Sequence, residues 1–224
     1  MDISADLRHR LRGIVVQRME TDPAHDLAHL DRVWVNAQAI SDETTNMRVL
    51  LAASYLHDLV NLPKNDPDRH FASRRSAEES EPILGNFGYT PEEIKATRHA
   101  IAAHSFSANI PPETAEACIL RDADRLDALG AIGVARNFSV SGALGRSLYD
   151  PADPFAESRS LDDLHFSVDH WKVKLLKLPA DMLTKRGKAL ARKRAERMIR
   201  FLTEFAEEIG HPLPLDWSQL NSTR

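Results

Sequence analysis

The sequence contains one cysteine, Cys118, among its 224 residues. A single thiol forms neither an internal disulfide nor a thiolate metal cage, which fits a reducing compartment. The chain also has no apolar run near the roughly 18 residues that a membrane-spanning helix requires. Its first residues scatter charges where a signal peptide has an apolar core. We therefore expect a cytoplasmic protein with no membrane contact.

An excess of positive charge is missing as well. The formal net charge is -4 and the isoelectric point is near 6.2, so binding to nucleic acid would need a local basic patch. Hydrophobic residues make up 42% of the chain and charged residues 28%, which excludes a wholly disordered chain. At this length we expect one domain, 1-224, with a core at about 25-130 and C-terminal helices at about 160-210 packed on it.

Strand pairs joined by hairpin turns are also absent, and several stretches have helical spacing instead. Leu27 to Ile40 places apolar residues three and four apart. Met47 to Leu59 is an apolar run too long for a typical strand, and it predicts a helix buried on most sides. An amphipathic helix is predicted from about Lys185 to Ile209. The sequence therefore predicts an all-α fold.

The ends of these elements are marked by local signals. Thr90, Pro91 and Glu93 have the order of an N-cap, a first-turn proline and the second half of a capping box. Residues 61-68 form a turn-rich loop. Residues 139-161 are rich in glycine and proline and predict a long surface segment, either a lid or a mobile loop.

The strongest local sign of chemistry is the pair His57-Asp58, which ends the apolar run. Burying an unpaired imidazole and carboxylate costs several kcal/mol, whereas a divalent cation satisfies both groups. The alternative is a helix end at which both side chains face solvent.

Two further segments combine histidine or aspartate with apolar residues. His25 and His29 are four residues apart, so on a helix both point the same way. Between Arg121 and Leu129, three aspartates alternate with small and apolar residues, and an acid turned inward needs a cation or an arginine. Taken singly, each segment is more often structural than catalytic.

Taken together, these segments resemble the HD-domain superfamily of metal-dependent phosphohydrolases, and in particular a branch of small single-domain HD hydrolases. The resemblance extends from about Asp26 to Met198, which is most of the chain. It is carried by the segments HDLAHLDRVW, LHDLVNLPKNDP, ASRRSAEES, IAAHSFS, DADRLDALGAIGVAR, DHWKVKLLKLP and RGKALARKRAERM.

The resemblance implies an HD-domain helical bundle with one divalent metal ion between its helices. The family's ligands fall on His29, which shortly precedes an Arg-Val pair, on His57 and Asp58, and on Asp124 within Ala-Asp-Arg-Leu. Two imidazoles and two carboxylates suit manganese or magnesium and admit iron, cobalt, nickel or zinc. Their charges balance a divalent ion and leave room for water and an anionic substrate.

Two of these assignments have local competitors. His25-Asp26 carries the same letters as His57-Asp58, but it lies where a helix begins, and Asp26 is more simply an N-cap. Asp122 competes with Asp124, and its simpler role is to cap a helix that begins there.

Around the metal we expect groups that bind phosphate. Lys64 and Asn61 follow the histidine-aspartate pair, in a loop able to fold back over the metal. Arg32, Ser73 and Arg74 are separated from the proposed ligands along the chain by lengths that allow the fold to bring them back to the site. The alternative for Lys64 is an ordinary exposed loop lysine.

His104 faces the interior of its predicted helix, whereas His99 falls nearly opposite. A hydrogen-bonded core histidine is one interpretation of His104. A general acid or a substrate contact near the metal is the other, and the resemblance includes His104-Ser105.

The predicted reaction is hydrolysis of a phosphoester or phosphoanhydride in a small nucleotide by metal-activated water. Asp58 orients or deprotonates the water, and Lys64 with Arg32 or Arg74 neutralises the developing charge. Nucleoside triphosphate pyrophosphohydrolysis or nucleotidase activity is favoured. The expected partner is a small phosphorylated substrate, and a homodimer is compatible with the sequence.

Two other functions stay open. A di-iron HD oxygenase would need a second metal site, for which His104 with His70 or His99 is the available source. A non-catalytic regulatory protein would bind a nucleotide or nucleic acid on the same scaffold. The basic run from Lys185 to Arg200 has no interleaved aromatic residues, which favours a solvated helix face over nucleic-acid binding.

Overall fold

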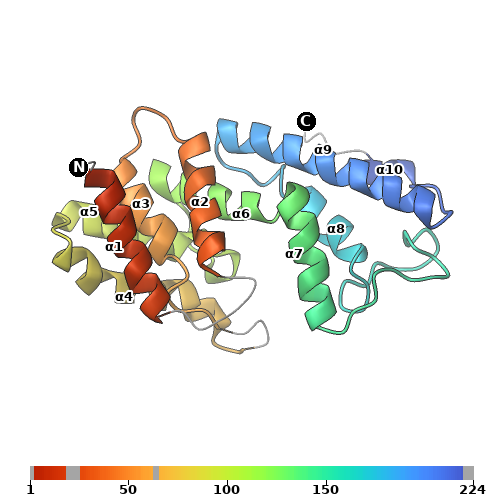
Figure 1. Cartoon of the computed structure of the whole chain (residues 1–224), viewed down its shortest axis with the longest axis horizontal. Helices are drawn as coiled ribbons and strands as arrows, with labels where there is room; N and C mark the ends of the chain where they lie inside the picture. Colours follow the sequence, from red (N-terminus) through yellow and green to blue (C-terminus); the bar gives the residue numbers. More distant parts are fainter. Residues whose placement is uncertain (1–2, 19–25, 63–65, 219–224) are drawn as a thin grey trace. The chain divides into compact units, whose positions relative to one another are not determined.

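The computed structural model of the chain describes residues 3-18, 26-62 and 66-218 (Figure 1). Within those ranges the chain is helical and has no strand, and its one β-bridge pairs Ser147 with Phe166. The prediction of an all-α fold is confirmed. No helix in these ranges is both long and apolar enough to cross a membrane. The chain divides into two compact units, Met1–Asp124 and Arg125–Arg224.

The first unit is built around α3 (Met47–Leu56), which packs against four other helices. Every α3 residue from Val49 to Leu56 is buried, as the long apolar run predicted. The surrounding elements are α1 (Ile3–Arg18), α2 (Leu27–Ile40), α4 (Ala72–Asn86) and α5 (Pro91–His104), with the short turns η1 (Arg69–Phe71) and η2 (Phe106–Ala108) and most of α6 (Ala115–Asp127).

The α3 helix ends three residues earlier than the predicted Leu59. His57 is its C-cap residue, and the His57 ring nitrogen Nδ1 donates a hydrogen bond to the carbonyl oxygen of Ser54, 3.0 Å away. A side chain thus satisfies one of the carbonyls that a helix leaves open at its end. The expected end at Leu59 is therefore wrong, and His57 and Asp58 lie immediately beyond the last turn.

Side-chain hydrogen bonds connect α2 to the neighbours that flank it. The hydroxyl of Tyr55 on α3 donates to the carboxylate of Asp31 on α2 at 2.6 Å, and Arg8 and Arg12 of α1 bind the same carboxylate. Buried Asn36 of α2 donates to the backbone carbonyl of Ala123 on α6 at 3.0 Å. The relative positions of α2, α3 and α6 are thereby fixed by directional bonds as well as by apolar packing.

The starts of α5 and α2, predicted from local signals, are confirmed. The Thr90 hydroxyl accepts from the amide of Glu93, and the Glu93 carboxylate accepts from the amide of Thr90, which completes the capping box of α5. Asp26 is the N-cap of α2, and its carboxylate accepts from the amide of His29 at 2.8 Å.

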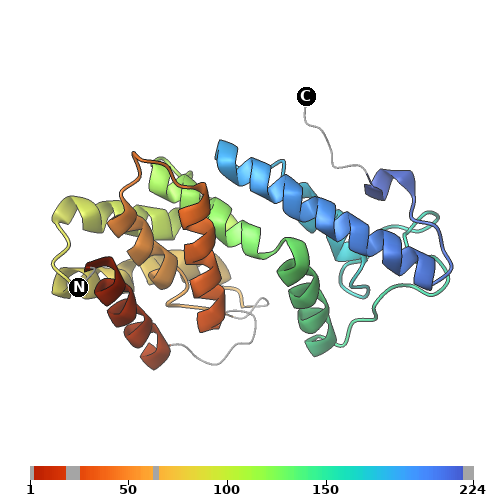
Figure 2. The same cartoon turned by 45° about the horizontal axis from the view of Figure 1, so that its top comes forward.

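The second unit is organised by α9 (Lys185–Glu208), the long helix drawn in blue in Figure 2. Its buried stripe consists of Gly187, Ala191, Ala195, Met198, Leu202 and Ala206, and α7 packs against it. Helix α9 ends one residue before the predicted Ile209, and Gly210 follows with a φ of 72°. The other elements are α7 (Gly130–Ala143), α8 (Asp169–Val173), η3 (Leu175–Lys177) and α10 (Leu215–Ser218).

The segment expected to be irregular over 139-161 begins later, because α7 continues to Ala143. From there to Val168 the chain folds around Asp169, whose side chain is fully buried. The guanidinium of Arg159 donates to both carboxylate oxygens of Asp169, and the amide of Asp162 donates to one of them. This buried ion pair gives the segment an interior of its own.

We expect Arg159→Ala to destabilise the protein strongly, since it leaves the buried Asp169 carboxylate without its cation. Loss of one partner of a buried pair costs about 3 kcal/mol or more, which urea unfolding will measure. The matched control is Arg146→Ala, in the same segment but with no ion pair among the described residues. Equal, small losses in both variants would contradict a structural role for the Arg159–Asp169 pair.

Candidate metal centre

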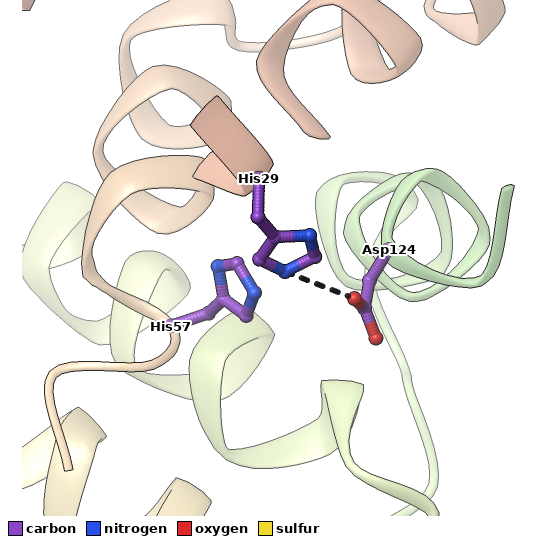
Figure 3. Close-up of side chains that lie close together, drawn as sticks. All are labelled: His29, His57 and Asp124. Carbon is purple, nitrogen blue, oxygen red and sulfur yellow. Dashed lines mark ion pairs between the residues drawn. The ribbon is translucent and has the colours of Figure 1, made fainter. Parts of the chain in front are cut away.

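Five ionisable side chains of the first unit converge where its helices begin or end. His29 lies in the first turn of α2, His57 and Asp58 follow α3, His104 is the last residue of α5, and Asp124 lies on α6. Figure 3 shows the rings of His29 and His57 and the carboxylate of Asp124 turned towards a common point. The residues are far apart in the sequence and are brought together by the packing around α3.

The distances among these groups are too long for good hydrogen bonds. His29 Nε2 lies 3.5 Å from Asp124 Oδ1 and 3.8 Å from Asp58 Oδ2. His57 Nε2 lies 3.5 Å from Asp58 Oδ2, and His104 Nε2 lies 3.6 Å from Asp58 Oδ1. An ion held about 2.1 Å from each ligand atom separates neighbouring ligand atoms by about 3 Å. The observed spacings are close to those of a coordination shell.

The orientation of two imidazoles is set by backbone carbonyls. His57 Nδ1 donates to the carbonyl of Ser54, and His104 Nδ1 donates to the carbonyl of Ile101 at 2.6 Å. Because a carbonyl only accepts, each Nδ1 carries the proton, and in the neutral ring Nε2 keeps its lone pair. Both Nε2 atoms face the cluster, which is the tautomer that a metal ligand requires.

Burial divides the cluster into a dry side and a wet side. The imidazoles of His29, His57 and His104 are 1%, 0% and 7% exposed, whereas the side chains of Asp58 and Asp124 are 18% and 31% exposed. The histidines therefore line the interior and the carboxylates line the opening. Solvent therefore meets the cluster at the carboxylates.

The surroundings of His57 and His104 shift the pKa values of these two histidines in opposite directions. Burial, the largest influence, lowers the pKa of His57 to about 4, so its ring is neutral at pH 7. Burial also disfavours the charged form of His104, but the nearby negative charge of Asp58 outweighs burial and raises the pKa of His104. A neutral imidazole and one whose pKa is raised thus lie side by side, their ring centroids 4.8 Å apart.

The residues present fit a divalent metal ion. His57 Nε2 is buried and has no hydrogen-bond partner, a costly state that a cation relieves. Potential ligand atoms form two groups that share His57, and within each group the atoms lie within 4.8 Å of one another. One group is His29, His57 and Asp124, and the other is His57, Asp58 and His104. Nitrogen and carboxylate donors in this number suit several divalent ions.

The residues that competed with the predicted ligands in the sequence lie outside the cluster or outside the described residues. Asp26 is used as the N-cap of α2, and His25 lies outside the described residues. The expected role of Asp122 as a helix cap is wrong, because α6 begins at Ala115 and Asp122 lies in its interior, fully buried. Thr114, whose hydroxyl accepts from the amide of Ala117, marks the true start of α6.

The residues expected to bind phosphate are spread more widely. Lys64 lies outside the described residues, Asn61 is exposed after α3, and Arg32 is half-buried on α2. Ser73 is buried and its hydroxyl donates to the carbonyl of Ala102. Arg74 lines an open groove between α4 and α5. Their contacts with a substrate stay a prediction.

The histidines required for a second metal ion are engaged elsewhere. His99 is half-buried and its Nε2 accepts from the amide of Glu113 at 2.9 Å. His70 is exposed, and its ring lies against that of Phe71. Neither belongs to a group of potential metal ligands among the residues that the structure describes.

Two supporting residues escaped the sequence interpretation. The carbonyl of Ser54, which orients His57, is a backbone group and leaves no sequence signal. Asn36, two turns after His29, was detectable as a polar residue beside an apolar stripe, because a buried amide needs a partner.

Comparison with known proteins agrees with this geometry. The HD-domain family model matches residues 26–129. The Bacillus subtilis protein YpgQ is 31% identical over 201 residues, which are 87% of this chain and 90% of YpgQ. The crystal structure of YpgQ in complex with ADP superposes with a TM-score of 0.72 at 28% identity, covering 92% of this chain and 96% of that one.

A second solved structure, that of an HD-superfamily hydrolase from Bacillus thuringiensis, is 31% identical and has a TM-score of 0.71. The alignment covers 92% of this chain and 98% of that protein. HD domains bind divalent metal ions, in agreement with the histidine and aspartate cluster described above. The chain belongs to the HD superfamily of hydrolases.

Proposed function

We propose that this protein is a divalent-metal-dependent phosphohydrolase acting on a small nucleotide, with His29, His57, Asp58 and Asp124 as the metal ligands. The observation that carries the proposal is the convergence of buried imidazoles with partly exposed carboxylates at ligand spacing. The relative YpgQ was solved in complex with ADP, which supports a nucleotide as the ligand class.

A bound divalent ion would supply Lewis acidity, which lowers the pKa of water and offsets the charge of a phosphoryl group. The protein's own residues then hold and direct the reactants. The Ser54 carbonyl keeps His57 Nε2 aimed at the centre. Asp58, 18% exposed at the opening, is placed to orient water and accept its proton.

His104 is the residue best suited to hold a proton near the reaction. Its Nε2 faces Asp58 Oδ1 at 3.6 Å, and its pKa is raised by that carboxylate. A protonated imidazole here would donate to a phosphate oxygen or to a leaving group. Lys64, Arg32 and Arg74 remain the proposed cations for the developing charge, and Asn61 and Ser73 remain proposed hydrogen-bonding residues. The favoured metals are manganese and magnesium, and the favoured reaction is release of pyrophosphate or phosphate from a nucleotide.

The reaction class is tested by a nucleotide panel assayed with manganese, magnesium, cobalt and nickel. We expect release of phosphate or pyrophosphate from at least one nucleotide, and loss of turnover to background in His57→Ala and Asp58→Ala, because each removes a proposed ligand. Liquid chromatography of the products distinguishes pyrophosphohydrolase from nucleotidase activity. Unchanged turnover in either variant would overturn the mechanism.

The choice between the two aspartates of α6 is tested by metal binding. We expect Asp124→Asn to weaken manganese binding by at least about tenfold, as loss of a ligand exceeds the effect of an outer-shell change. Asp122→Asn is the matched control, two residues away on the same helix, and it should retain the ion. Titration calorimetry and metal analysis of both folded variants provide the measurement, and the reverse pattern would assign the ligand to Asp122.

The role of His104 is tested by pH dependence. If protonated His104 is required, kcat falls as the pH rises through its raised pKa, and His104→Gln both lowers kcat by about 10²-fold or more and removes that limb of the profile. His99→Gln, on the same helix, should leave the profile unchanged. Loss of bound metal in His104→Gln, with no change in the limb, would instead make His104 a ligand.

A further inference from the structure

The polar side of α9 carries a row of cations opposite the buried stripe. Five of them are exposed and Lys188 is half-buried. They recur over the first two thirds of the helix. All but Lys188, which borders the buried stripe, lie on the side away from Ala191, Ala195 and Met198. This basic face consists of Lys185, Lys188, Arg192, Lys193, Arg197 and Arg200.

Among the residues that the structure describes, no carboxylate forms an ion pair with any side chain of the basic face. Arg194 provides the contrast within the same run. It lies half-buried and its guanidinium donates to the carbonyl of Leu126, and burial lowers the pKa of Arg194 although the charge of Asp127 opposes this. One cation of the run is therefore part of the unit's interior, whereas the basic face makes no comparable contact.

Keeping these charges together costs stability. Lys188 with Arg192, and Lys193 with Arg197, are like charges four residues apart, each pair destabilising by a few tenths of a kcal/mol. The positive end of the helix dipole lies at the same end as the cations, which adds to the repulsion. One acid, Glu196, lies among these cations, and the other acids of the helix, Glu204, Glu207 and Glu208, are gathered in its last turns.

The amino-acid composition of the basic face limits which class of anionic partner it can bind. From Lys185 to Arg200 there is no aromatic residue, which disfavours a single strand bound by base stacking. No large apolar side chain there is exposed, which disfavours insertion into a lipid surface. Serine, threonine, asparagine and glutamine are absent too, so the face lacks the neutral side chains that bind the ribose hydroxyl.

The length of the face matches an extended row of phosphates. Sixteen residues of helix span about 24 Å at 1.5 Å per residue, and duplex DNA presents one negative charge per about 1.7 Å of its axis. The whole chain has a net charge of -4 and so offers no general attraction to a polyanion, and a local patch is what such binding needs. The sequence favoured a solvated helix face because the basic run contains no aromatic residue. Contacts to backbone phosphates, however, do not require aromatic side chains.

We propose that the basic face of α9 binds double-stranded DNA through its phosphate backbone, without sequence preference. This inference is independent of the metal centre and of the nucleotide hydrolysed there. Binding of this kind releases counterions, so the affinity falls steeply as salt rises.

Fluorescence anisotropy with a labelled duplex of about 20 base pairs tests the proposal between about 50 and 200 mM salt. We expect an apparent Kd of about 10⁻⁶ to 10⁻⁴ M for the unmodified chain. The triple variant Lys193→Gln, Arg197→Gln, Arg200→Gln should bind more weakly and reduce the slope of log K against log salt by about 3, about one unit for each phosphate that is no longer neutralised.

The matched control removes three exposed lysines outside α9, with the same change in net charge: Lys95→Gln, Lys174→Gln, Lys177→Gln. It should leave the affinity and the slope unchanged, and circular dichroism confirms that both triple variants fold. Equal weakening in the control would overturn the proposal, since net charge alone would then explain binding. So would equal displacement by polyglutamate, or tighter binding to single-stranded DNA, an RNA duplex or phosphatidylserine vesicles.

Discussion

The hydrogen bond from His57 Nδ1 to the Ser54 carbonyl is the contact on which the centre depends most directly. It ends α3, fixes the tautomer of a fully buried imidazole and leaves Nε2 directed at the carboxylates. Without it, the ring would be free to present a protonated nitrogen to the cluster. The same device recurs at His104 with the Ile101 carbonyl, so two of the three histidines are oriented by the carbonyl three residues earlier.

The surrounding helices carry these groups to a common point because their contacts are directional. Tyr55, two residues before His57, binds Asp31, two residues after His29. Asn36 binds the carbonyl of Ala123, next to Asp124. Each proposed ligand therefore has a restraining bond within two turns of its own position. A cluster built this way keeps its spacing even though its members come from separate segments.

Local signals in the sequence were sufficient for much of this arrangement. The start of α5 was predictable because a capping box involves only Thr90 to Glu93, and Asp26 was identified as a cap for the same reason. The end of α3 was not, because it is decided by a side-chain bond to Ser54. Asp122 was misplaced because the cap of α6 was sought eight residues after Thr114, where the helix begins. The inward orientation of His104 followed from helical spacing, but its approach to Asp58 required the packed structure.

The proposed ligands extend from His29 to Asp124, so they come from nearly the whole length of the first unit. An ion held by all of them would tie the N-terminal and C-terminal parts of that unit to each other, as a cross-link does. Since unfolding would separate the ligands, the free energy of binding adds to the free energy of folding, by about 2.7 kcal/mol when the free ion is at a hundred times its Kd. The availability of metal would then raise the fraction of the unit that is folded, as well as allow it to turn over substrate.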